Sequence, residues 1–341
     1  MSEGNRQLGV IVVAAGAGTR MRSALPKVLH PICGRSLLGH VLAVADALAP
    51  AHTVVVLAPD TLAQVRASFG ERYTYVVQAE RLGTGHAVLQ AAPALRNTVD
   101  EVLVLYGDTP LVRTTTAREV LDLRRERAAL VGLMSFHAHP PSGYGRVLRD
   151  AAGQVSGLIE ERDATPEQRA ISEGNSGIMS FAASWLWQTL PRVPRNPTKG
   201  EYYLTDLVAL AVGERGPGAA VALAAGDERE AWGINDRIQL AEAEAVLRQR
   251  LLAALMRDGV TVTDPATTYV DVGVTVGADT LLLPGTLLRG TTQVGAGCEI
   301  GPYTTIVDAT IGDGARVRHA LIERAVIPSE AVIGPFAHIV G

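Results

Sequence analysis

The chain has 341 residues, of which 47% are hydrophobic and 19% charged, and its formal net charge is −4. These proportions are typical of a globular protein with room for two domains, and the charge argues against a nucleic-acid-binding surface. Cys33 and Cys298 have the spacing of neither a zinc site nor a disulfide framework. We therefore expect a cytoplasmic protein, and no apolar run is long enough to insert into a membrane.

From residue 8 to about residue 230, short apolar runs alternate with helical patterns. The expected strands are Gly9–Val13, Thr53–Ala58, Tyr73–Val77, Glu101–Tyr106, Ala129–Phe136, Val155–Ile159, Ser176–Phe181 and Ala220–Ala224. The expected helices are Leu37–Ala49, Thr61–Ser68, Gly85–Ala94, Thr115–Arg127 and Tyr202–Val212. This alternation predicts an α/β domain with a mostly parallel sheet, in which ligands bind beyond the carboxyl ends of the strands.

A glycine-rich turn, Ala14 to Arg20, follows the first expected strand, and Lys27 comes shortly after it. Such a turn lets backbone N–H groups approach phosphate oxygens, and the two cationic side chains add fixed positive charge. The turn lacks the Gly-Lys-Ser/Thr of a Walker A loop, and Met21 stands where a dinucleotide fingerprint has a third small residue. Taken alone, it is more often a tight connection than a phosphate site.

Two further segments follow expected strands. Asp108 comes two residues after the end of a strand at Tyr106, so it is either a hard oxygen ligand for Mg²⁺ or a turn residue before Pro110. The segment Gln78–Ala87 contains Gly83 and Gly85 and opens a helix. Its backbone can read the edge of a planar base, although a plain glycine-rich connection is the commoner use of such a sequence.

Polar residues also bracket the expected strand at Val155–Ile159. Gly143–Arg146 and Glu160 flank what we predict to be a hairpin or a strand pair, and Asn175 precedes the next strand, so these groups could bind sugar hydroxyls. Each of them alone is more often a turn or surface residue. His137 and His139 lie two apart on a strand, but no third ligand is evident, and we expect no metal there.

The last third of the chain has a different pattern. Asn235 to Arg257 predicts one long helix that Gly259 could end. Aliphatic residues then recur every six positions with a slip after Ile306, at Val270, Val276, Leu282, Leu288, Val294, Ile300, Ile306, Ile311, Val317, Ile327, Ile333 and Ile339. This hexapeptide period predicts a parallel β-helix. It stops at Gly341 without a polar cap, which suggests either a shortened chain or an end covered by something else.

Together these motifs resemble the sugar-1-phosphate nucleotidyltransferases, whose signature is residues 14–21 with Leu25-Pro26-Lys27. The segments 78–80 with 82–87, 143–146, 200–206 and 233–237 are similar to one branch, the bifunctional N-acetylglucosamine-1-phosphate uridylyltransferase/glucosamine-1-phosphate N-acetyltransferases. The match is collinear from about residue 8 to residue 339. It implies a Rossmann-like nucleotide-diphospho-sugar transferase domain (1–231), a helical linker arm (232–260) and an incomplete left-handed β-helix (261–341).

The resemblance implies synthesis of UDP-N-acetylglucosamine and pyrophosphate from UTP and N-acetylglucosamine-1-phosphate, for peptidoglycan and lipid A precursors, by a homotrimer. The alternatives are a nucleotidyltransferase for another sugar-1-phosphate and a non-catalytic regulatory subunit. In the family, the acetyltransferase site lies in coils beyond a segment similar to Gly334–Ile339. Because the sequence stops at Gly341, we do not expect acetyl transfer from these residues.

The resemblance also implies roles for individual residues. Phosphate-binding catalytic roles fall to Arg20 and Lys27, and Mg²⁺ binding to Asp108 and Asn235. The remaining substrate-binding positions are divided among the nucleotide (Val13, Ala14, Ala15, Gly16 and Gly18), uracil (Gln78, Gly83 and Thr84) and the sugar and ribose (Tyr106, Gly107, Gly145, Glu160 and Asn175).

Overall fold

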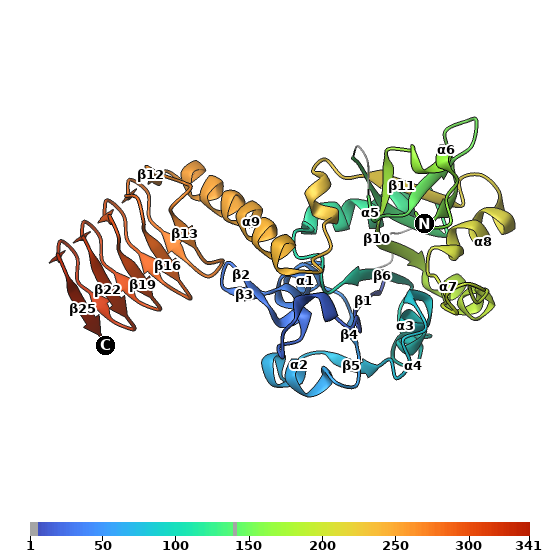
Figure 1. Ribbon diagram of the computed structural model, residues 1–341, viewed down its shortest axis with the longest axis horizontal. Helices are drawn as coiled ribbons and strands as arrows, with labels where there is room; N and C mark the ends of the chain where they lie inside the picture. Colours follow the sequence, from blue (N-terminus) through green and yellow to red (C-terminus); the bar gives the residue numbers. More distant parts are fainter. Residues whose placement is uncertain (1–5, 139–141) are drawn as a thin grey trace. The chain divides into compact units, whose positions relative to one another are not determined.

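A computed structural model describes residues 6–138 and 142–341, which form two compact units. The first unit consists of the chain up to His30 together with Leu37–Asp236, and the second of Pro31–Ser36 together with Arg237–Gly341 (Figure 1). His139, one of the two histidines weighed above as metal ligands, lies outside the described residues.

The first unit is built on one nine-stranded sheet. Its main strands, in spatial order, are β11 (Ala220–Ala224), β7 (Val131–His137), β10 (Glu173–Ala182), β6 (Glu101–Tyr106), β1 (Leu8–Ala14), β4 (His52–Leu57) and β5 (Thr74–Val77). The pairs along β6-β1-β4-β5 and the pair β11-β7 are parallel, whereas β10 runs antiparallel to both β6 and β7. The predicted hairpin is present as β8 (Arg146–Arg149) and β9 (Val155–Ile159).

The helices of the first unit connect these strands. They are α1 (Leu37–Ala47), α2 (Leu62–Phe69), α3 (Thr84–Gln90), α4 (Ala92–Leu95), α5 (Thr114–Glu126), α6 (Pro166–Arg169), α7 (Ala183–Thr189) and α8 (Asp206–Arg215). The sequence did not predict α6 or α7, and the helix expected at Gly85–Ala94 is divided into α3 and α4. The helix expected from Tyr202 begins only at Asp206, because Tyr202 forms an extended bridge with Arg195.

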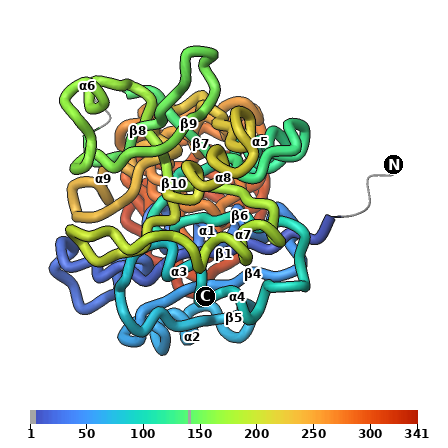
Figure 2. Tube along the Cα trace, turned by 90° about the vertical axis from the view of Figure 1, so that its right-hand side faces the viewer, coloured from blue at the N-terminus to red at the C-terminus, as the bar shows by residue number. Residues whose placement is uncertain are grey.

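Alternating residues of the central strands enter two separate cores. On β1, Val10 and Val12 belong to a cluster that includes residues of α1, α2 and α5, whereas Ile11 belongs to one that includes residues of α3, α4, α7 and α8. Figure 2 shows α3 alongside β1 and β4, which it contacts. Because both faces are covered, these strands are continuous apolar runs rather than alternating ones.

The second unit contains α9 (Arg237–Arg257), a short hairpin of β2 (Pro31–Ile32) and β3 (Arg35–Ser36), and three parallel sheets of very short strands. The first of these sheets contains β12 (Thr261–Val262), β15 (Leu281–Leu282), β18 (Glu299–Ile300), β21 (Arg316–Val317) and β24 (Val332–Ile333). The second contains β13 (Tyr269–Val270), β16 (Leu287–Arg289), β19 (Thr305–Val307), β22 (Ala320–Glu323) and β25 (Ala337–Val340), and the third β14 (Thr275–Val276), β17 (Gln293–Val294), β20 (Thr310–Ile311) and β23 (Val326–Ile327).

Successive coils of this second unit are stacked in register. Tyr269 pairs with Leu287 and Leu287 pairs with Thr305, so three hexapeptides make one coil of 18 residues. The repeating aliphatic residues form a continuous core, and Ile322, which the sequence analysis passed over, is fully buried among them. Among the described residues, no helix is both long enough and apolar enough to cross a bilayer.

Candidate active site

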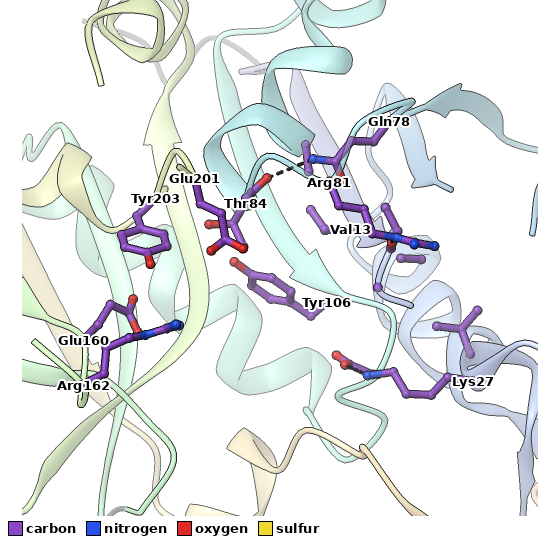
Figure 3. Close-up of a pocket in the computed structure, with 17 residues that line it drawn as sticks. Val13, Lys27, Gln78, Arg81, Thr84, Tyr106, Glu160, Arg162, Glu201 and Tyr203 are labelled. Atoms are coloured by element: carbon purple, nitrogen blue, oxygen red, sulfur yellow. Dashed lines mark hydrogen bonds and ion pairs between the residues drawn. The ribbon is translucent and has the colours of Figure 1, made fainter. Parts of the chain in front are cut away.

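A cavity of about 360 Å³ lies at the carboxyl ends of β1 and β6 in the first unit (Figure 3). Most of the side chains predicted from the sequence line it, namely Val13, Ala14, Ala15, Gly16, Lys27, Gln78, Gly83, Thr84, Tyr106, Asp108 and Glu160. Predicted residues that do not line it are Gly18, Arg20, Gly107, Gly145, Asn175 and Asn235. The contacts of most of these six residues show how they support the residues that do line the cavity.

The glycine-rich turn brings Lys27 to the cavity. Gly18 has a φ of +59°, and a Cβ on it would lie 2.7 Å from the Cβ of Lys27, so only glycine permits this close approach. By contrast, a Cβ on Gly16 would meet nothing within 4 Å, which leaves the backbone open toward the cavity that Gly16 lines. Arg20 lies in the short 3₁₀ helix η1 (Thr19–Met21) and is exposed to solvent.

Lys27 joins Asp108 and Asn235. Its Nζ forms an ion pair with Oδ2 of Asp108 and donates a hydrogen bond to Oδ1 of Asn235 at 3.2 Å. The backbone N–H of Ile234 donates to the carbonyl of Asp108 at 2.9 Å, which holds the two oxygen-bearing residues together. The Asp108 carboxylate and the Asn235 amide oxygen thus both contact the ammonium group of Lys27. Hard oxygens of these two kinds are the ligands that Mg²⁺ prefers.

No three His, Cys, Asp or Glu side chains gather as a metal site in the part of the chain that the structure describes. A cation held by Asp108 and Asn235 would therefore have few protein ligands. That fits Mg²⁺, which is usually bound by one or two protein groups together with substrate phosphates and water.

Tyr106 and Gly107 join the end of β6 to the glycine-rich turn. The N–H of Gly107 donates to the carbonyl of Val13 at 2.9 Å, and a Cβ on Gly107 would lie 3.0 Å from that of Ala14. The absence of a side chain at Gly107 thus allows the end of β6 to pack closely against the glycine-rich turn. Burial raises the pKa of the Tyr106 phenol, so the side chain stays neutral as it faces the cavity.

The bend that was predicted to read a base is joined to a segment distant in sequence, residues 202–204. Gly83 has a φ of +93°, and a Cβ on it would lie 2.6 Å from the carbonyl oxygen of Tyr202. Tyr202 donates through its N–H to the carbonyl of Leu82 at 2.7 Å and accepts from the N–H of Gly85 at 2.8 Å. The Thr84 hydroxyl oxygen accepts from the N–H of Leu204 at 3.0 Å. The bend is therefore held to residues 202–204 by three hydrogen bonds.

Gly145, Glu160 and Asn175 lie together on another side of the site. The N–H of Asn175 donates to the carbonyl of Gly145 at 2.9 Å, and a Cβ on Gly145 would lie 3.7 Å from Oε2 of Glu160. Burial raises the pKa of Glu160, although its Oε1 accepts a hydrogen bond from the Thr205 hydroxyl at 3.2 Å. These residues can present both donors and acceptors to a sugar.

Sequence reasoning missed four polar side chains that line the cavity, namely Arg81, Arg162, Glu201 and Tyr203. Arg81 donates from Nε to the carbonyl of Ala15 at 3.2 Å, and the guanidinium of Arg162 lies 6.0 Å from the ring centre of Tyr203. The Tyr203 hydroxyl is buried without a hydrogen-bond partner among the described residues. Three of the four fall inside motifs that were quoted from the sequence. Their place in those motifs was the signal that could have identified them as site residues.

Comparison with known proteins agrees with this geometry. Residues 10–172 match the family described as the MobA-like NTP transferase domain. Three proteins named bifunctional protein GlmU are similar over nearly the whole chain. The one from Thermobifida fusca is 47% identical over 97% of this chain and 68% of its own length. Those from Streptomyces avermitilis and Brevibacillus brevis are 44% and 39% identical, each over 98% of this chain and over 70% and 72% of their own lengths.

These matches confirm the predicted fold class, a Rossmann-like transferase domain followed by a left-handed β-helix, and the predicted enzyme class, a uridylyltransferase. They do not favour the alternative of a non-catalytic subunit. With such identity sustained over two thirds or more of each relative, the chain belongs to the GlmU family.

Proposed function

We propose that this chain makes UDP-N-acetylglucosamine from UTP and N-acetylglucosamine-1-phosphate in the cavity of the first unit, using the residues described above. One observation carries the assignment of the site. The ion pair of Lys27 and Asp108, which Lys27 also joins to Asn235, lies at a cavity whose walls include both the glycine-rich turn and the bend at Gln78–Thr84. The site thus combines positive charge, hard oxygens and a polar wall suited to a base.

In the proposed reaction, a phosphate oxygen of the sugar phosphate attacks the α-phosphorus of UTP. An oxygen–phosphorus bond forms, and the bond from the α-phosphorus to pyrophosphate breaks, with the electron pair leaving on pyrophosphate. Since the nucleophile is already anionic, no general base is required. Catalysis then depends on positioning and charge neutralisation. Lys27 holds the attacking phosphate, and Arg20 neutralises the departing pyrophosphate.

Asp108 and Asn235 would hold Mg²⁺, which when bound supplies positive charge to phosphate oxygens. The contact of Lys27 with both residues supports this assignment, because it shows that the two oxygens suit a cation. Around them, the backbone of Val13–Gly16 faces the nucleotide phosphates. Gln78, Gly83 and Thr84 would read uracil.

The sugar would bind against Tyr106, Glu160 and the backbone of Gly145, with Asn175 beside them. The phenol of Tyr106 and the carboxyl group of Glu160 both line the cavity and can hydrogen-bond with sugar hydroxyls. The unpartnered hydroxyl of Tyr203 adds a further donor to this wall.

We also propose the division into residues 1–231, 232–260 and 261–341, a cytoplasmic location, and a homotrimer formed through the β-helix. Flat-sided coils pack readily around a three-fold axis, which supports the trimer. Sedimentation equilibrium measures it directly: a mass three times 35.9 kDa is expected, and a monomer at micromolar concentration would contradict it.

The substrate assignment is tested by pyrophosphate release with UTP, dTTP or ATP against N-acetylglucosamine-1-phosphate or glucose-1-phosphate, with and without Mg²⁺. We expect the highest kcat/KM for UTP with N-acetylglucosamine-1-phosphate, and no turnover after the metal is removed by a chelator. A higher kcat/KM for another pair would replace the proposed substrates. No release with any pair would instead favour a non-catalytic role.

A further inference from the structure

A neighbouring carbonyl is the first of two groups that orient the Gln78 side-chain amide. Gln78 is only 4% exposed, and its Nε2 lies 3.0 Å from the carbonyl oxygen of Gly83 (Figure 3). Because a carbonyl oxygen can only accept, the amide NH₂ group must face it. The amide oxygen of Gln78 is therefore the atom left to accept a hydrogen bond from a ligand in the cavity.

The second hydrogen of this NH₂ group points at a histidine. Nε2 of Gln78 lies 3.1 Å from Nδ1 of His86, in the first turn of α3. For this contact to be a hydrogen bond, Nδ1 must carry a lone pair. His86 must then be neutral, with its proton on Nε2.

The side-chain amide of Gln90 also faces the His86 ring and competes with Gln78 for its lone pair. Nε2 of Gln90 lies 3.1 Å from Nε2 of His86 and also donates to the His86 carbonyl at 3.1 Å. A neutral imidazole has only one lone pair, so it can accept from Gln78 or from Gln90, but not from both. Gln78 is buried, whereas Gln90 is partly exposed and can turn to water. An unsatisfied buried donor costs far more than a solvated one, so Gln78 takes the lone pair.

We propose that His86 is a positioning residue: its Nδ1 holds the Gln78 amide with the oxygen toward the nucleobase, so that the site selects uracil over cytosine. Uracil presents an N3–H donor, which the amide oxygen accepts. Cytosine presents an unprotonated N3, which that oxygen repels. This inference rests on the proposed function, since it requires that Gln78 face the base of UTP.

Two variants of His86 that resemble each other in shape test this proposal. His86→Asn places an amide oxygen where Nδ1 was and keeps the acceptor, whereas His86→Leu has nearly the shape of asparagine and no acceptor. We expect His86→Leu to lower the ratio of kcat/KM for UTP to that for CTP by about tenfold, the size of one hydrogen bond. The KM for UTP should rise while that for N-acetylglucosamine-1-phosphate stays unchanged. His86→Asn should restore most of the ratio.

Gln90→Leu is the matched control, because it removes the other amide that faces the same ring. It should leave the UTP-to-CTP ratio unchanged. An unchanged ratio in His86→Leu would overturn the proposal. Equal losses in His86→Leu and His86→Asn would also overturn it, since the ring would then act through its shape alone.

The tautomer gives a readout that does not depend on turnover. In the wild-type protein labelled with ¹⁵N-histidine, the His86 ring is expected to carry its proton on Nε2, with Nδ1 as the acceptor. A proton on Nδ1 would overturn the inference even if the variants fail to fold. If the wild type releases no pyrophosphate from UTP, the proposed function fails, and the tautomer still decides how Gln78 is held.

Discussion

The two units of this chain are specified by their sequence in opposite ways. In the β-helix, each strand pairs with one a single coil away, such as Leu287 with Thr305, and one short pattern is repeated. In the α/β unit, Lys27 contacts partners 81 and 208 residues distant. A repeat therefore builds stability from near-identical local parts, whereas a site is assembled from parts that are each unlike the others.

A difference in energetics follows from this difference in construction. In a solenoid each coil touches only its neighbours, so the effects of substitutions are close to additive and local. In a cluster of buried charges, the removal of one member leaves its partners unsatisfied. Substitutions in the site should therefore have larger effects than most substitutions in the β-helix.

Asp108→Ala should have the largest effect. It removes the carboxylate that pairs with Lys27, whose side chain is only 8% exposed, and one of the two oxygens that would hold the metal. We expect kcat for pyrophosphate release to fall by about 10³-fold, the upper range for loss of one preorganised electrostatic group. Glu71→Ala is the control, because it breaks the exposed ion pair with Arg66. A similar loss in both variants would deny Asp108 any special role.

Leu288→Ala tests the core of the β-helix. The Leu288 side chain is fully buried in β16, so its truncation leaves a cavity between coils. The free energy of unfolding should fall by about 2–5 kcal/mol, measured by urea denaturation. The outward-facing Leu321 is 36% exposed, and Leu321→Ala should change this free energy much less. Equal changes in the free energy of unfolding for the two variants would mean that the inward-facing leucine contributes no more to stability than the outward-facing one.

Arg20→Ala tests a cation that the structure leaves exposed in η1. If Arg20 neutralises the departing pyrophosphate, kcat should fall by about 10²-fold with little change in the KM for either substrate. The neighbouring Arg22 is also exposed, and Arg22→Ala serves as the control. Turnover close to that of the wild type in Arg20→Ala would remove this residue from the mechanism.

Thr286→Val should have the smallest effect. The buried Thr286 hydroxyl donates to the carbonyl of Leu283 at 2.7 Å, and valine keeps its shape without the donor. Loss of the hydrogen bond should lower the free energy of unfolding by about 1 kcal/mol. Thr305→Val, at a partly exposed position in β19, should cost less. If Thr286→Val were neutral, Thr286 would contribute through its shape alone.

Much of the fold could be predicted because its signals are local. The strand Glu101–Tyr106 was predicted with its observed bounds, since an apolar run buried on both faces is distinctive. Ile322 was missed because it lies five residues from each of its neighbours in the repeat, Val317 and Ile327, instead of six. The helix α7 was missed because it has only seven residues, too few for the helical spacing of Ala183, Leu186 and Trp187 to be distinctive in the sequence.

The site was predictable only in part. The resemblance supplied Lys27, Asp108 and Asn235, which the fold brings together. It did not supply Arg81 or Tyr203, although both lie inside quoted motifs. Whether such a side chain faces the cavity depends on how the segments 82–85 and 202–204 pair, and this long-range pairing has no local sequence signal.

The pairing of segments 82–85 and 202–204 also limits the distance between two walls of the cavity. Gln78 belongs to the wall that would receive the base, while Glu201 and Tyr203 belong to the opposite part of the cavity (Figure 3). Because residues 82–85 are hydrogen-bonded directly to Tyr202 and Leu204, the two walls cannot move apart without breaking those bonds. If the proposed base and sugar positions hold, we expect the cavity to discriminate among ligands by their span from base to sugar as well as by their chemistry.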